Sequence, residues 1–119
     1  MEEEKKQMHI DVDKEYKRMK QLFKNIPNEK LKIVDGLLRQ SARLKVGLDY
    51  AWRDIEKNGE YDLYYNSPDA PGMERERPVA KIFTQRHGAY QKTIGDLIRL
   101  LPEEAAEEVK SQFDSSDLT

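Results

Sequence analysis

The 119-residue sequence has no cysteine and only two histidines, and both scarcities restrict the chemistry open to the chain. Without cysteine there are no disulfides, thiolate ligands or thiolate nucleophiles, and the chain suits a reducing compartment. His9 and His87 lie far apart, and neither has a partner at the spacing of a metal-binding motif. The glycines are scattered singly, so no phosphate-binding loop is present. We therefore expect a protein that is not an enzyme, with no metal, cofactor or small-molecule substrate.

Long apolar runs are also missing. No run approaches the ~20 residues that cross a bilayer, and the N-terminus lacks the apolar segment of a secretory signal. These absences predict a soluble, cytoplasmic protein with no membrane partner. Hydrophobic and charged residues each make up 37% of the chain, and the mean hydropathy is −0.93. Such a composition cannot fill a thick core and favours thin helical layers that complete their burial by self-association.

Charge of either sign is unevenly distributed, although the net charge is only −2. Residues 25–57 and 73–102 carry net charges of +2 and +3, whereas residues 58–72 and 103–119 carry −3 and −5. The two basic segments are compatible with contact to nucleic acid. Solvated helix faces explain the same charges, so composition alone leaves both interpretations open.

Apolar spacing and proline positions predict a first helix from about Asp11, after a disordered segment over residues 1–10. Its apolar residues recur at steps of four, three and four, namely Val12, Tyr16, Met19 and Phe23. Pro27 ends this helix and opens a second one, which runs from about residue 28 to 57. The pair Asn58-Gly59 then provides a stop, with Gly59 in a left-handed cap position.

The second helix carries two apolar stripes rather than one. The first consists of Leu31, Val34, Leu38, Leu48, Trp52 and Ile55, and the second of Ile33, Leu37, Leu44 and Ala51. Two stripes on one helix indicate contacts on two sides. One side would meet a hairpin partner, and the other a third helix or a neighbouring subunit.

Residues 60–77 predict either an ordered loop or a small β-hairpin, because tyrosines flank the turn sequence NSPDAPG. Pro78 is well placed as the first residue of a third helix, which Pro102 stops before a short acidic helix. The fold class is therefore all-α, an antiparallel hairpin of two long helices with a short N-terminal helix and a short acidic C-terminal helix. These elements form a single domain over residues 11–113, followed by a disordered tail over residues 114–119.

Two candidate binding surfaces follow from these elements. A basic face on the first helix, opposite its apolar stripe, is the candidate nucleic-acid site and consists of Lys14, Lys17, Arg18, Lys20 and Lys24. The basic residues of the third helix are spread around its circumference and predict no such face. A second, apolar set forms either the core of the hairpin or an oligomer interface, namely Ile33, Leu37, Leu44, Leu48, Trp52, Ile55, Phe83 and Tyr90.

The order of these features resembles a known family. A long helix ends at Ile55 to Gly59, a polar connection follows, Arg77-Pro78 opens a second long helix, and Leu100-Leu101-Pro102 closes it. Over residues 22–104 this arrangement is similar to the small subunits of phage terminases, the short proteins encoded beside the large terminase gene of tailed phages. The chain differs from that family in its near-neutral charge and in lacking a distinct DNA-binding module.

The resemblance implies a phage or prophage protein of a bacterial cytoplasm that forms helical homo-oligomers. It would help to recognise viral DNA during packaging and regulate the large terminase subunit without catalysis of its own. A phage structural or regulatory interaction module that never touches DNA is the alternative. A small hydrolase or metal-dependent enzyme is a third class, which the scarcity of catalytic motifs disfavours.

Overall fold

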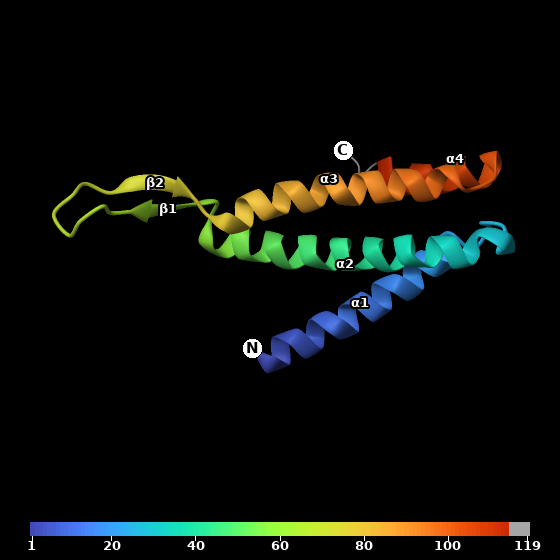
Figure 1. Cartoon of the computed structure of the whole chain (residues 1–119), viewed down its shortest axis with the longest axis horizontal. Coiled ribbons are helices and arrows are strands. Elements are labelled where there is room, and N and C mark those ends of the chain that lie inside the picture. The colour runs from blue at the N-terminus through green and yellow to red at the C-terminus, as the bar shows by residue number, and fades with distance from the viewer. Residues whose placement is uncertain (115–119) are drawn as a thin grey trace.

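Four helices and one small antiparallel sheet make up the described part of the chain (Figure 1). The computed structural model describes residues 1–114, with Asp114 by its backbone alone. In chain order the elements are α1 (Glu2–Leu22), α2 (Asn28–Asn58), β1 (Tyr61–Tyr64), β2 (Met73–Glu76), α3 (Pro78–Arg99) and α4 (Glu103–Asp114). The fold is mostly helical, as predicted. Apart from Asp114, which ends α4, the predicted disordered tail over residues 114–119 lies outside the described residues.

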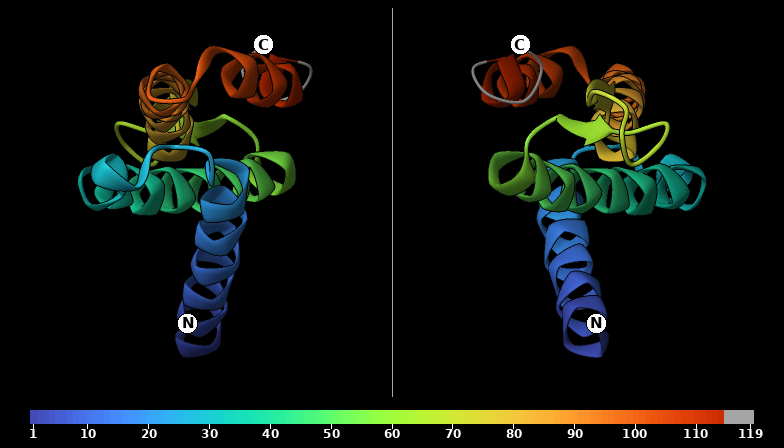
Figure 2. Two further views of the ribbon diagram at one scale, coloured as in Figure 1. Left: turned by 90° about the vertical axis from the view of Figure 1, so that its right-hand side faces the viewer. Right: turned by 90° about the vertical axis from the view of Figure 1, so that its left-hand side faces the viewer.

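Helix α2 is the middle layer of an elongated molecule. Figure 2 shows α3 and α4 on one side of α2 and α1 on the other, where α1 points steeply away from the body toward the N-terminus. The two sides of α2 that the double stripe predicted are thus covered by α3 and by the third helix, α1. The Cα atoms extend over 64 × 31 × 22 Å, with the β-hairpin at one end and the α1–α2 turn at the other (Figure 1).

Helix α1 begins at Glu2, nine residues before the predicted start at Asp11, and it is not a short helix. Residues 2–10 belong to it rather than to a disordered segment. They lack apolar periodicity, but they are rich in glutamate, lysine, glutamine and methionine, which are good helix formers. The three glutamates of the first turn also suit the positive end of the helix dipole. A Gln7–Asp11 side-chain hydrogen bond of 3.0 Å supports the next turn.

The boundaries of α2 and α3 follow the proline and glycine positions. Pro27 immediately precedes α2, and Gly59 ends it with a φ of 82°, a region that favours glycine because it lacks Cβ. The Gly59 ψ of 174° makes this an extended exit rather than a left-handed cap. Pro78 is the first residue of α3, as predicted. Arg77 steadies the junction, because its guanidinium donates to the Gly59 carbonyl (2.7 Å) and to Asp54 (2.9 Å).

The segment between α2 and α3 forms a β-hairpin, the second of the two predicted alternatives. Strands β1 and β2 pair antiparallel, with Tyr61 opposite Glu76 and Tyr64 opposite Met73. All eight strand residues are exposed. The hairpin therefore extends from the helical body as an arm, with no core of its own.

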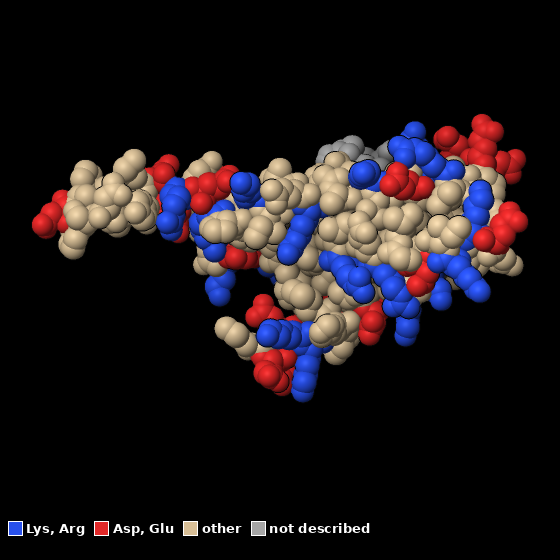
Figure 3. Space-filling view, in the orientation of Figure 1, with Lys and Arg blue, Asp and Glu red and all other residues tan. Residues whose placement is uncertain are grey.

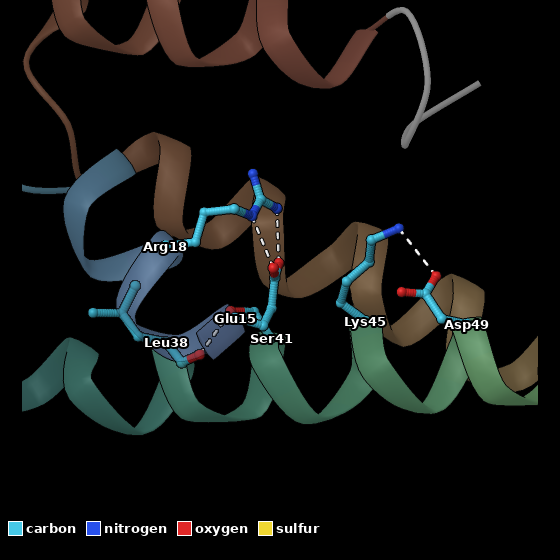
Figure 4. Close-up of polar contacts among 6 residues, drawn as sticks. All are labelled: Glu15, Arg18, Leu38, Ser41, Lys45 and Asp49. Carbon is cyan, nitrogen blue, oxygen red and sulfur yellow. Dashed lines mark hydrogen bonds and ion pairs between the residues drawn. The ribbon is translucent and has the colours of Figure 1, made fainter. Parts of the chain in front are cut away.

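The core lies where α1 and α3 pack on α2, and α4 contributes Val109 and Phe113 to it. Its largest fully buried side chains are Met19, Phe23, Ile26, Val34, Ser41, Tyr90, Ile94, Leu97 and Phe113. Two polar residues, Ser41 and Lys45, lie between the apolar residues of the first α2 stripe. Ser41 is tolerated there because its hydroxyl donates to the Leu38 carbonyl at 2.8 Å. Lys45, the other polar position of that stripe, is half-buried and bonds Asp49 at 3.3 Å (Figure 4).

Candidate nucleic-acid interface and apolar surfaces

The five basic candidates do not form one continuous face. Lys14, Lys17, Arg18 and Lys20 lie on α1, whereas Lys24 lies in the turn that follows it. At 100° per residue, Lys14 and Arg18 point away from the apolar stripe, and Lys17 lies about a quarter-turn from Tyr16. Lys20 borders the contact with α2, with its ammonium 5.4 Å from the centre of the Tyr16 ring. The structure thus divides the predicted set into an outward group and a group beside the core.

Arg18 is largely committed within α1. Its guanidinium donates two hydrogen bonds to the Glu15 carboxylate, at 2.8 and 2.7 Å (Figure 4). This paired geometry reduces the charge that Arg18 offers to a phosphate. Lys14 and Lys17 are both exposed, and neither forms a salt bridge within residues 1–113. They are therefore the members of the set best placed to contact a phosphate backbone.

Two tyrosine–aspartate hydrogen bonds fix α1 on α2 and so fix the direction of its basic side. The Tyr16 hydroxyl donates to Asp35, whose other oxygen accepts from Arg39 at 2.9 Å. The Tyr50 hydroxyl donates to Asp11 at 2.8 Å. The first bond joins α1 to the early part of α2, and the second joins α1 to the late part of α2. Sequence reasoning missed both bonds, because pairs 19 and 39 residues apart give no local signal.

The four groups in these bonds have shifted pKa values. The hydrogen bond from Tyr50 lowers the pKa of Asp11, with help from Gln7, and the bond from Tyr16 lowers the pKa of Asp35, with help from Arg39. Each carboxylate in turn raises the pKa of its tyrosine. Because folding lowers the carboxyl pKa, these bonds stabilise the fold above the ordinary value of 3.8, and this stabilisation is lost in acid. Because folding raises the phenol pKa, the same bonds stabilise the fold below the ordinary value of 10.0, and this stabilisation is lost in alkali.

Stability from the tyrosine–aspartate bonds is therefore expected to be flat between about pH 4 and pH 10 and to fall on either side. The double variant Tyr16→Phe/Tyr50→Phe removes both bonds while it leaves the aromatic rings in place. Urea unfolding of both proteins across this range measures the effect. The stability difference should be constant inside the window and should shrink outside it. A difference that does not change with pH would mean that the bonds are not formed in solution.

The surface around the basic candidates is mixed in sign. A hollow of about 320 Å³ between α1 and α2 is lined by acidic Asp11, Glu15 and Asp49 and by basic Lys14, Arg18, Lys45 and Arg53. Figure 3 shows lysine and arginine side chains along the lower edge of the body, and acidic side chains gathered over α4 at the right-hand end. The carboxylates beside these cations weaken the attraction of this surface for a phosphate backbone.

The apolar candidates separate into core and surface residues. Leu48, Ile55 and Tyr90 are buried, and Leu37, Leu44 and Phe83 are half-buried. The core interpretation is wrong for two residues, because Ile33 is 79% exposed and Trp52 is 46% exposed. Both lie on predicted stripes, yet α1 and α3 each cover only part of the α2 circumference.

Trp52 lies at the surface of the helical pair, although its neighbour in sequence, Ala51, is buried. The Trp52 ring packs on Phe83, with centroids 5.7 Å apart, and Phe83 stacks on His87 at 6.1 Å. These three rings form a partly exposed aromatic row across α2 and α3.

Trp52→Ala is expected to lower the free energy of unfolding by only about 1–2 kcal/mol, because one face of the ring already meets solvent. A fully buried aromatic ring would cost about 3–5 kcal/mol. Chemical denaturation monitored by circular dichroism measures the loss. A loss in the higher range at low protein concentration would show that the ring is buried within one chain.

The histidines and carboxylates of the described range do not gather into a metal site. No three histidine, aspartate or glutamate side chains there could together hold a metal ion. His87 is held against the Phe83 ring, and His9 is exposed on the projecting part of α1. Among the described helices, none is both long enough and apolar enough to cross a bilayer.

No family model, curated protein or solved structure matches this chain.

Sequence reasoning missed a third surface, on the β-hairpin. Its large apolar side chains are all exposed, namely Tyr61, Leu63, Tyr64, Tyr65 and Met73. The alternation in Tyr-Asp-Leu-Tyr, followed by the turn sequence, was the signal that could have found it. In Figure 3 most of the outer arm is tan, with acidic atoms at its tip and side chains of both charges at its base.

Proposed function

We propose that the protein is a non-catalytic DNA-packaging accessory of a phage or prophage, similar to the small subunits of terminases. In this function it forms a homo-oligomer in the bacterial cytoplasm, helps to recognise viral DNA and regulates the large terminase subunit. The observation that supports it most is α1, which the two tyrosine–aspartate bonds fix on α2 and which carries the exposed Lys14 and Lys17.

The DNA part of the proposal depends on Lys14 and Lys17. Both are exposed and lie three residues apart on α1, a helix that keeps them at a fixed spacing. Two lysines per chain give only weak binding to a phosphate backbone. An oligomer repeats them, and simultaneous contacts raise the overall affinity without any new contact in the single chain.

The oligomer part depends on the exposed apolar groups. Ile33, Trp52 and the apolar residues of the hairpin lie on different parts of an elongated molecule. In a protein with 37% charged residues, exposed apolar groups of this size indicate an interface where another surface covers them.

Two measurements test the proposal, the mass of the protein in solution and the salt dependence of its binding to DNA. Light scattering over a range of concentrations should give an oligomer, and binding to a duplex from the terminase gene region should weaken steeply with salt. A strict monomer that ignores DNA at 50 mM salt would overturn the proposal.

The alternative is a helical interaction module that does not bind DNA. The Arg18–Glu15 pair favours it, because this pair removes one cation from the basic candidates. An oligomer whose DNA binding is absent at low salt would support this alternative.

A further inference from the structure

The β-hairpin arm carries its apolar side chains without cover. A two-stranded sheet is marginally stable in water unless a further strand or a packed surface supports it. Here all the strand residues are exposed, so neither α2 nor α3 provides that support. The arm is thus a surface that needs a partner.

The two faces of the hairpin differ. Residues directly opposite in an antiparallel pair share a face, which places Asp62, Arg75, Tyr64 and Met73 together. The charges on this face are already paired, because Arg75 bonds Asp62 at 3.3 Å and lies 5.0 Å from the centre of the Tyr64 ring.

The other face combines a row of apolar side chains with two carboxylates. Tyr61 and Leu63 lie opposite Glu76 and Glu74, and the Tyr65 ring continues the row over Gly72. Neither glutamate forms a salt bridge within residues 1–113. Residues 60–76 contain five acidic residues and one basic residue, a net charge of −4. This face therefore fits a surface that is apolar and basic.

A surface with that chemistry lies at the opposite end of the molecule. A hollow of about 390 Å³ lies at the start of α2. Two leucines and two lysines line it, namely Leu31, Leu38, Lys20 and Lys32. Its one acidic residue, Asp35, is already bonded to Tyr16 and Arg39. Residues 20–33 contain four basic residues and one acidic residue, a net charge of +3.

We propose that the Tyr61–Leu63–Tyr65 face of the hairpin docks into the Leu31–Lys32 hollow of a second copy of this chain. The two surfaces lie at opposite ends of a molecule 64 Å long, so they cannot meet within one chain. A contact between unlike surfaces joins copies head to tail and closes into a ring or continues as a chain. The inference rests on the oligomer part of the proposed function and identifies the surfaces that meet.

The absence of cysteine allows a direct test, because each introduced thiol is the only one in its chain. Leu63→Cys and size-tagged Lys32→Cys proteins are mixed and oxidised. A disulfide forms only where the two Cα atoms come within about 7 Å. The mixture should give a disulfide-linked heterodimer. The matched control replaces Lys32→Cys with Lys92→Cys, which changes another exposed lysine, on α3, and should give little of the heterodimer.

A yield no higher than that of the control overturns the docking. So does a product made mainly of two Leu63→Cys chains, which would place hairpin against hairpin. An oligomer without the expected cross-link overturns this interface alone and leaves the proposed function standing. A protein that stays monomeric at every concentration overturns the interface together with the oligomer part of that function.

A charge exchange gives an independent check. Glu74→Lys should weaken self-association about fivefold by placing like charges together, and Glu74→Lys/Lys32→Glu should recover most of the loss. Sedimentation equilibrium measures the self-association constant of each variant, and circular dichroism confirms that the variants fold. Additive losses without recovery would contradict the pairing.

Discussion

Phe23→Ala is expected to lower the free energy of unfolding by about 3–5 kcal/mol, the range for deleting a fully buried aromatic ring. The Phe23 ring is 1% exposed and packs against Phe113 of α4, with ring centroids 6.5 Å apart. It follows directly on the last turn of α1, where its amide donates to the Met19 carbonyl. Its loss would therefore leave a cavity at the point where α1, the turn and α4 meet.

Trp52→Ala is the matched control, because it also deletes an aromatic ring from a helical region but from a half-exposed site. Urea unfolding of both variants at the same low protein concentration should give clearly different midpoints. Hydrogen exchange should also rise in α4 for Phe23→Ala alone, since its cover is lost there. Equal losses in the two variants would contradict the burial that separates these rings.

The helical framework could be predicted because its signals are local. Steps of three and four residues through Tyr16, Met19 and Phe23 mark one face of a helix, and two of these three side chains are fully buried. Pro27 and Pro78 each set the start of a helix, since proline suits the first turn and lacks the amide that later turns need. Such features depend on neighbours in sequence and not on the rest of the fold.

Burial along a stripe could not be predicted in the same way. Ile33 and Val34 are adjacent in sequence and both lie on apolar stripes of α2, yet one is 79% exposed and the other is fully buried. The difference depends on how far α1 and α3 extend around α2, which is a property of the assembled helices. Similarly, the helical state of residues 2–10 follows from propensity and charge rather than from apolar periodicity.

The candidate site shows the same division. The pairing of Arg18 with Glu15 could have been recognised from the sequence, because residues three apart on a helix are neighbours. The proximity of Lys20 to the α2 contact could not, because it requires the crossing of α1 over α2 that Tyr16 and Asp35 fix. The aromatic face of the hairpin was not predicted, because the sequence left residues 60–77 open between an ordered loop and a small β-hairpin.

Lys14→Glu/Lys17→Glu is expected to weaken binding to duplex DNA by about 10- to 100-fold at 50 mM salt. It should also make the slope of log affinity against log salt shallower by about two. Both side chains are exposed on α1 and lie outside the core, so the fold should survive the change. Fluorescence anisotropy at several salt concentrations measures the affinity and the slope, and circular dichroism checks the fold.

The control variant Lys57→Glu/Lys92→Glu changes the net charge by the same amount at exposed positions on α2 and α3. If DNA follows the projecting helix, this control should keep nearly the full salt slope. Equal losses in both variants would mean that affinity follows net charge rather than position, and α1 would no longer be the site. A shallower slope for the α1 variant alone, with an unchanged oligomer mass, would separate the DNA surface from the surfaces that join the subunits.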